Sequence, residues 1–143
     1  MFASRATRLL AALAAAVVGA LAVCSPAWAW AWPADGPVLR GFSVSGDEYA
    51  AGQHRGIDIG LGTAATFRSP VSGTVTFAGS VPANGLTVTV AAGEYKATLT
   101  HLGQLHVRRG QTVSEGDVLA EPGPTGEPEY AVPYVHLGIR VGS

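Results

Sequence analysis

The sequence predicts an all-β domain, and two observations carry that prediction. The chain of 143 residues has 19 glycines and 9 prolines, and after Gly60 these residues recur at short intervals. No segment there keeps the period of an amphipathic helix, whereas several short segments alternate polar and apolar residues. We therefore expect antiparallel strands joined by turns and longer loops. The length is enough for one domain with a sizeable core.

Three segments in the middle of the chain have a clear strand pattern. Residues 73–79 and 86–90 alternate polar and apolar side chains, and residues 95–101 do so again. The turn at residues 91–94 should join the second and third segments into a hairpin. Side chains two apart in a strand share a face, so the third segment should carry four residues on one face: Tyr95, Ala97, Leu99 and His101.

The C-terminal part of the chain predicts shorter β segments and then one long strand. Residues 107–120 hold two short β segments, and residues 122–133 are rich in Pro, Gly and Glu, which indicates a surface loop. The last strand is expected at residues 134–141. Its core face would be Val135, Leu137, Ile139 and Val141. Its other face would be Tyr134, His136, Gly138 and Arg140, which either lines a site or is a solvated surface with a chance histidine.

The N-terminal residues 1–29 resemble a secretory signal peptide. Arg5 and Arg8 precede an uncharged apolar run at residues 9–23, and Ala-Trp-Ala at residues 27–29 fits a cleavage site. The alternatives are an uncleaved anchor and lipidation at Cys24, the only cysteine. Residues 30–49 are expected to be an extended lead-in to the domain. We expect the mature chain to be secreted, extracellular or attached to the cell wall, with no stable membrane span.

The charge of the chain argues against a nucleic-acid partner. Removing residues 1–29 lowers Lys+Arg from 9 to 7 against 10 acidic residues, which leaves a net charge of −3. Such a chain has no basic stripe for nucleic acid and no electrostatic attraction to anionic membranes. It would also lack cysteine, so its stability must come from its core or from a metal.

One short segment carries candidate metal ligands. His54 and Asp58 lie four residues apart, and an imidazole and a carboxylate are both good ligands for zinc. Gly56 between them is a poor helix former, so the segment is expected to be a loop that enters a strand, with Gly56 letting the backbone bend. Taken alone, the pair is more often a solvated surface pair than a site.

Four motifs in order resemble the lysostaphin-like (LytM-type) zinc metallopeptidases that cut peptidoglycan. They are His-Arg-Gly-Ile-Asp at residues 54–58, Ser-Pro-Val-Ser-Gly-Thr-Val at 69–75, Thr-His-Leu at 100–102 and Val-His-Leu at 135–137. The match covers residues 50 to 141, which sets the expected domain at 50–143. The resemblance implies the antiparallel β-sheet or sandwich core of that family (the duplicated hybrid motif), with long loops around a groove.

The resemblance also implies roles for individual residues. His54, Asp58 and His136 match the ligands of one zinc ion, and His101 matches a catalytic histidine that does not bind the metal. Tyr134 stands where the family usually has a second catalytic histidine. A phenol in that position can donate a hydrogen bond to an oxyanion, but with an ordinary pKa of about 10 it is a poor base at neutral pH.

The implied function is that of a secreted zinc metalloendopeptidase that hydrolyses cross-links or stem peptides in peptidoglycan. The alternative is a catalytically weak or inactive module on the same fold that binds the wall or regulates another wall hydrolase, because Tyr134 replaces a histidine. A lipoyl-type carrier domain is a weaker third interpretation, since Lys96, the only lysine, lies within a predicted strand. We expect a monomer whose partner is a peptidoglycan peptide.

Overall fold

The structure is a computed structural model that describes residues 30–47 and 49–142. The proposed signal segment, with Cys24, lies outside the described residues. The described residues contain strands, turns and loops but no helix, which confirms the all-β prediction. No helix in this part of the chain is long and apolar enough to span a membrane.

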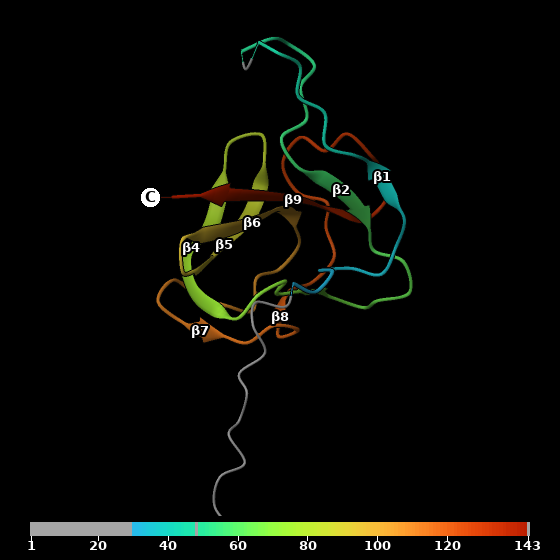
Figure 1. Ribbon diagram of the computed structural model, residues 1–143. Coiled ribbons are helices and arrows are strands. Elements are labelled where there is room, and N and C mark those ends of the chain that lie inside the picture. The colour runs from blue at the N-terminus through green and yellow to red at the C-terminus, as the bar shows by residue number, and fades with distance from the viewer. Residues whose placement is uncertain (1–29, 48, 143) are drawn as a thin grey trace, which may run out of the picture.

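Seven of the nine strands form one antiparallel sheet, in the order β1-β2-β9-β6-β5-β4-β7 (Figure 1). The sheet strands are β1 (Val38–Arg40), β2 (Ile57–Gly60), β4 (Gly73–Val81), β5 (Gly85–Ala92), β6 (Tyr95–Leu102), β7 (Thr112–Val113) and β9 (Tyr134–Val141). The other two, β3 (Phe67–Arg68) and β8 (Val118–Ala120), pair with each other. The four predicted long strands therefore exist with boundaries close to those expected.

Two long connections flank the strands that carry the site residues. The segment between β1 and β2 extends away from the body of the domain, as Figure 1 shows. Residues 122–133 form no strand, as predicted, and lead into β9. Within the described part of the lead-in, residues 38–40 form β1, which pairs with β2 at one edge of the sheet. β9 lies between β2 and β6, so it is a central strand although it is last in the chain.

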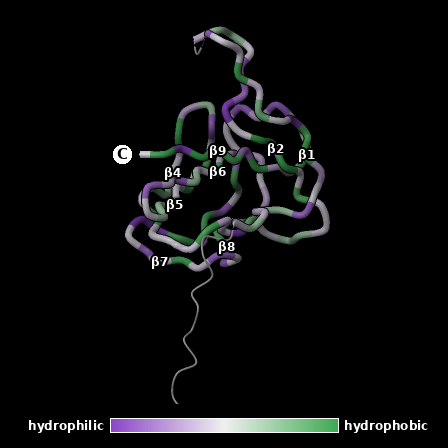
Figure 2. The backbone as a smooth tube through the Cα atoms, viewed as in Figure 1, coloured by the Kyte–Doolittle hydropathy of each residue, from purple (hydrophilic) through white to green (hydrophobic). Residues whose placement is uncertain are grey.

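The core lies between one face of the sheet and the β3–β8 pair. Alternate residues of β5 and β6, the first part of β9 and Val75 of β4 are buried there together with Phe67 and Leu119. In Figure 2 apolar stretches follow β2, β8 and β9, while polar stretches gather in the connecting loops. This is the pattern expected of an antiparallel sheet with one face against a core.

The predicted core face of β9 is correct for the first half of the strand and wrong for the second half. Val135 and Leu137 are buried, but Ile139 is 49% exposed and Val141 is 66% exposed. The buried core reaches along β9 only as far as Leu137. Near Ile139 the same face is covered only in part by residues 30–32 of the lead-in.

Candidate metal centre

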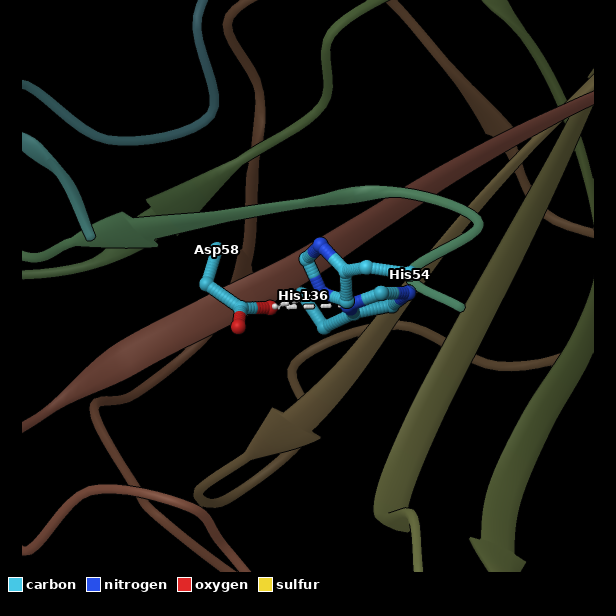
Figure 3. Close-up of side chains that lie close together, drawn as sticks. All are labelled: His54, Asp58 and His136. Carbon is cyan, nitrogen blue, oxygen red and sulfur yellow. Dashed lines mark hydrogen bonds and ion pairs between the residues drawn. The ribbon is translucent and has the colours of Figure 1, made fainter. Parts of the chain in front are cut away.

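Three side chains converge where β2 and β9 pair. Asp58 in β2 lies directly opposite His136 in β9, and directly opposite residues of antiparallel strands point to the same face. His54 lies just before β2 and is held by two backbone hydrogen bonds with Ser43, of 2.9 and 2.7 Å. Figure 3 shows the three side chains of His54, Asp58 and His136 pointing toward one another.

The ligand atoms of these residues lie very close together. Asp58 Oδ1 is 2.7 Å from His136 Nδ1 and 3.2 Å from His54 Nε2, and the two imidazole nitrogens are 3.1 Å apart. Asp58 is 2% exposed and His54 is buried, whereas the His136 side chain is 26% exposed. The cluster is therefore buried on one side and open on the side of His136.

This cluster fits a zinc ion. Tetrahedral zinc with bonds of about 2.0–2.1 Å places neighbouring ligand atoms about 3.3 Å apart, close to the separations found here. His54 Nδ1 donates to the Gly41 carbonyl oxygen at 2.8 Å, so Nε2 carries the lone pair that faces the cluster. Lone pairs this close repel one another unless a proton or a cation lies between them. Three protein ligands also leave a fourth position for water or substrate, as catalytic zinc sites require.

Gly56 is needed for a reason other than the expected bend. A Cβ at this position would lie 2.5 Å from His136 Nε2 and 2.5 Å from the Leu137 carbonyl oxygen. Its backbone is not in the left-handed region that favours glycine. The missing side chain therefore lets the 54–58 segment lie against β9, and this close approach brings His136 next to Asp58.

His101 lies on the opposite face from the one predicted. Two residues of β6, Thr100 and His101, oppose the single residue Thr87 of β5, which is a β-bulge. His101 has a φ of 61°, and its ring lies beside that of Tyr134 with centroids 5.2 Å apart. The bulge thus turns His101 from the core face toward the face that carries Tyr134 and His136. Strand alternation alone does not reveal such a bulge.

The tautomer of His101 follows from its partner. His101 Nδ1 donates to the Thr125 carbonyl oxygen at 2.9 Å, which leaves Nε2 with the lone pair when the ring is neutral. Thr125 is itself held firmly, because its hydroxyl donates to Leu102 O at 2.6 Å and accepts from Leu86 N at 2.8 Å. The 122–133 loop therefore fixes the orientation of the His101 ring.

Tyr134 is buried and its ring contacts two other aromatic rings. The His101 ring is tilted with its centroid 5.2 Å away, and the Tyr130 ring is perpendicular with its centroid 5.0 Å away. The Tyr134 hydroxyl oxygen accepts the backbone N–H of Glu129 at 3.1 Å. Burial, followed by the nearby charges of Asp58 and Glu129, raises the pKa of Tyr134 above its usual value, although the Glu129 hydrogen bond opposes this. Tyr134 is therefore a proton donor and not a base at neutral pH.

Tyr130 is the residue that the sequence did not indicate. It lies in the 122–133 loop, which composition alone describes only as surface. Its ring contacts that of Tyr134 with centroids 5.0 Å apart, so Tyr130 lies next to a predicted site residue. Burial and then the charge of Asp58 raise the pKa of Tyr130. No local pattern could have predicted this, because it depends on how the loop folds back over β9.

The match to known families covers the same part of the chain as these residues. Residues 52–143 match the sequence model of Peptidase family M23. The chain belongs to this family. The lysostaphin-like resemblance seen in the sequence is thereby confirmed, and this part of the chain is called the M23 domain below.

Individual relatives agree with the family assignment. The M23 domain is similar to a Lipoprotein NlpD/LppB homolog of Pseudomonas aeruginosa, with 36% identity over 99 residues that cover 68% of this chain and 32% of that protein. A zinc-containing peptidase from Vibrio cholerae has a similar structure, with a TM-score of 0.64, 25% identity and coverage of 80% of this chain and 37% of that one. The chain spans about a third of the length of each of these two proteins.

The fold is also that of lysostaphin. The catalytic domain of lysostaphin from Staphylococcus simulans superposes with a TM-score of 0.59 at 21% identity, covering 82% of this chain and 80% of that domain. At this identity the likeness concerns the fold alone. It confirms that the expected lysostaphin-like antiparallel β core is present.

Replacing Tyr134 tests whether its hydroxyl takes part in the chemistry. Tyr134→Phe keeps the ring packing on His101 but removes the only side-chain acceptor of the Glu129 N–H seen in the described part of the chain. We expect Tyr134→Phe to lower any peptide-hydrolysing activity of this site by about 100- to 1000-fold, which is the effect of losing one oxyanion donor, and to leave zinc affinity unchanged. Tyr49→Phe is a matched control, since Tyr49 is 86% exposed. An unchanged rate in Tyr134→Phe would show that the hydroxyl is only structural.

Proposed function

We propose that this chain is a secreted zinc metalloendopeptidase that hydrolyses peptide bonds in bacterial peptidoglycan, in cross-links or in stem peptides. The observation that carries the proposal is the convergence of His54, Asp58 and His136 within 3.2 Å of one another. Two imidazoles and one carboxylate around an open position are a donor set of catalytic zinc. Membership of the M23 family and the likeness to a zinc-containing peptidase support it.

Each site residue has a distinct part in the proposed hydrolysis. One zinc ion held by His54, Asp58 and His136 would supply Lewis acidity and lower the pKa of water at the site. His101 Nε2 accepts a proton from the attacking water and delivers it to the amine nitrogen as the carbon–nitrogen bond breaks. Tyr134 donates its hydroxyl proton in a hydrogen bond to the oxyanion that forms on the carbonyl oxygen.

The proposal includes a location and a partner. The signal-like segment at residues 1–29 and the similarity to a protein named as a lipoprotein support a place in the cell envelope or outside the cell. The partner is a peptide of the cell wall, and the M23 domain acts as a monomer. The mature chain has a net charge of −3, which gives no support to a nucleic-acid partner.

Digestion of purified cell-wall sacculi tests this function. The zinc-loaded protein is incubated with sacculi, and soluble fragments are identified by mass spectrometry with and without a chelator. We expect new peptide ends that are absent with chelator and with His54→Ala. His106→Ala is the matched control, because His106 pairs with Glu121 and not with the metal cluster. Sacculi left intact by the folded, zinc-loaded protein would refute the endopeptidase.

A module that binds the wall or regulates another hydrolase is the second candidate, and one observation favours it. The imidazole that the family usually has at position 134 is replaced here by a phenol that cannot act as a base near neutral pH. If the protein binds zinc and sacculi without cutting them, while Tyr134→His cuts, this second function is correct. Cutting by the unchanged protein excludes it.

A further inference from the structure

A groove runs along the polar face of the sheet beside the metal cluster. It has a volume of about 470 Å³, and His136 lies at one end while Lys96 and Arg140 line it further along. Its floor is formed by side chains of β5, β6 and β9, including a pair of threonine hydroxyls, on Thr89 and Thr98, that are 3.0 Å apart. A groove of this size accommodates part of a peptide rather than a single small group.

The charges in this groove all have one sign. Its lining includes Arg55, Lys96 and Arg140 and contains no acidic residue, although the chain as a whole has a net charge of −1. Lys96 in β6 is directly opposite Arg140 in β9. Like charges placed directly opposite each other on neighbouring strands destabilise a sheet, so the pair needs another reason to be there.

Neither cation is neutralised within the described part of the chain. No ion pair or side-chain hydrogen bond is formed there by Lys96 or Arg140, whereas Arg40, for comparison, pairs with Glu129 at 2.8 Å. Two adjacent, unpaired cations on a concave surface create a local positive potential that attracts an anion from solution. A carboxylate is a natural partner, since a guanidinium and an ammonium both donate hydrogen bonds to it.

The distance from the metal cluster fixes where that carboxylate would lie on a bound peptide. His136 and Arg140 are four residues apart on the same face of β9, which corresponds to about 13 Å along the strand. Between them lies Gly138, which also lines the groove and has no side chain to divide it. An extended peptide covers about 13 Å in roughly four residues.

We propose that Lys96 and Arg140 bind a free carboxylate of the substrate and so make the M23 domain selective for acidic peptides. The carboxylate lies about 13 Å, or roughly four extended residues, from the bond that is cut. This inference rests on the proposed endopeptidase, because it concerns the same groove. Lys96 and Arg140 are specificity-determining residues and take no part in the bond cleavage itself.

Binding to two forms of the same wall tests the inference. One form is purified sacculi whose peptides have free carboxylates, and the other is the same sacculi after carbodiimide and ammonia have converted these carboxylates to carboxamides. The full chain is mixed with each form in the presence of chelator, so that no cutting occurs, and the bound fraction is measured by sedimentation. We expect binding to the amidated wall to be on the order of five- to tenfold weaker.

Charge variants show whether Lys96 and Arg140 cause the preference for the wall with free carboxylates. The double variant K96Q/R140Q should bind both walls equally, at the level of the unchanged protein on the amidated wall. K96R/R140K keeps the charges and should retain the preference. R108Q/R109Q makes the same charge change outside the groove and should also retain it. Equal binding of both walls by the unchanged protein, or an undiminished preference in K96Q/R140Q, would overturn the inference.

This experiment separates the inference from the proposed function. Carboxylate-dependent binding without any peptide release from zinc-loaded protein would refute the endopeptidase and leave the binding site in place. Peptide release at equal rates from both walls, by the unchanged protein and by K96Q/R140Q, would leave the endopeptidase in place and refute the selectivity.

Discussion

Asp58→Asn is expected to reduce zinc affinity by at least about 100-fold and to lower wall hydrolysis to the level seen with chelator. Losing an outer hydrogen-bond partner of a zinc ligand already costs about 10- to 100-fold in affinity, and Asp58 is itself a ligand in this account. The substitution keeps the shape of a side chain that is 2% exposed, but it removes the negative charge that faces His54 and His136.

Zinc titration and unfolding measurements check this expectation. Zinc that binds only the folded state raises the midpoint of thermal unfolding, and Asp58→Asn should abolish that rise at zinc concentrations that saturate the unchanged protein. Asp117→Asn is a matched control, because Asp117 accepts a hydrogen bond from Ser114 N in a turn away from the cluster. Undiminished zinc binding by Asp58→Asn would remove Asp58 from the site.

Gly56→Ala is expected to damage both the site and the fold. The added Cβ would lie 2.5 Å from His136 Nε2 and from the Leu137 carbonyl oxygen, so either the ring or the backbone of β9 must move. Overpacking of this kind costs about 1–3 kcal/mol in the free energy of unfolding. Since His136 Nδ1 has to remain near Asp58, we also expect zinc affinity to fall by at least about tenfold.

Gly46→Ala provides the comparison for that prediction. Nothing lies within 4 Å of a Cβ added at Gly46, and its φ is not in the positive region, so stability and zinc affinity should stay close to those of the unchanged protein. Both variants are compared by urea denaturation in the presence of chelator and by zinc titration. If Gly56→Ala binds zinc as tightly as Gly46→Ala, the close approach at Gly56 does not position His136.

The strands were predictable because alternation is a local property of the sequence. Residues 73–79 and 134–141 alternate clearly, and the structure has β4 and β9 there. The order of the strands was not predictable in the same way. Nothing local indicates that β9 inserts between β2 and β6, yet this placement puts His136 opposite Asp58. The metal ligands were predicted from the resemblance of the motifs to a known family. The alternation of residues predicted only that Tyr134 and His136 share a face of the strand.

The predictions that the structure contradicts were wrong for identifiable structural reasons. The face predicted for His101 was wrong because a β-bulge adds one residue to β6. A bulge that contains no glycine has no recognisable sequence pattern. Ile139 and Val141 are exposed because the buried core ends at Leu137 on this strand, which depends on how distant segments pack against the sheet. Tyr130 was missed because its position follows from the fold of a loop rather than from any periodic pattern.

Anomalous diffraction from crystals of the zinc-loaded protein shows directly whether His54, Asp58 and His136 hold the metal. Data collected on either side of the zinc absorption edge locate the metal without any assumption about the protein. We expect one zinc peak, bonded to His54 Nε2, His136 Nδ1 and a carboxylate oxygen of Asp58, with His101 close by but not bonded. A protein crystallised with excess zinc that shows no peak among these three residues, or a peak bonded to other residues, would contradict it.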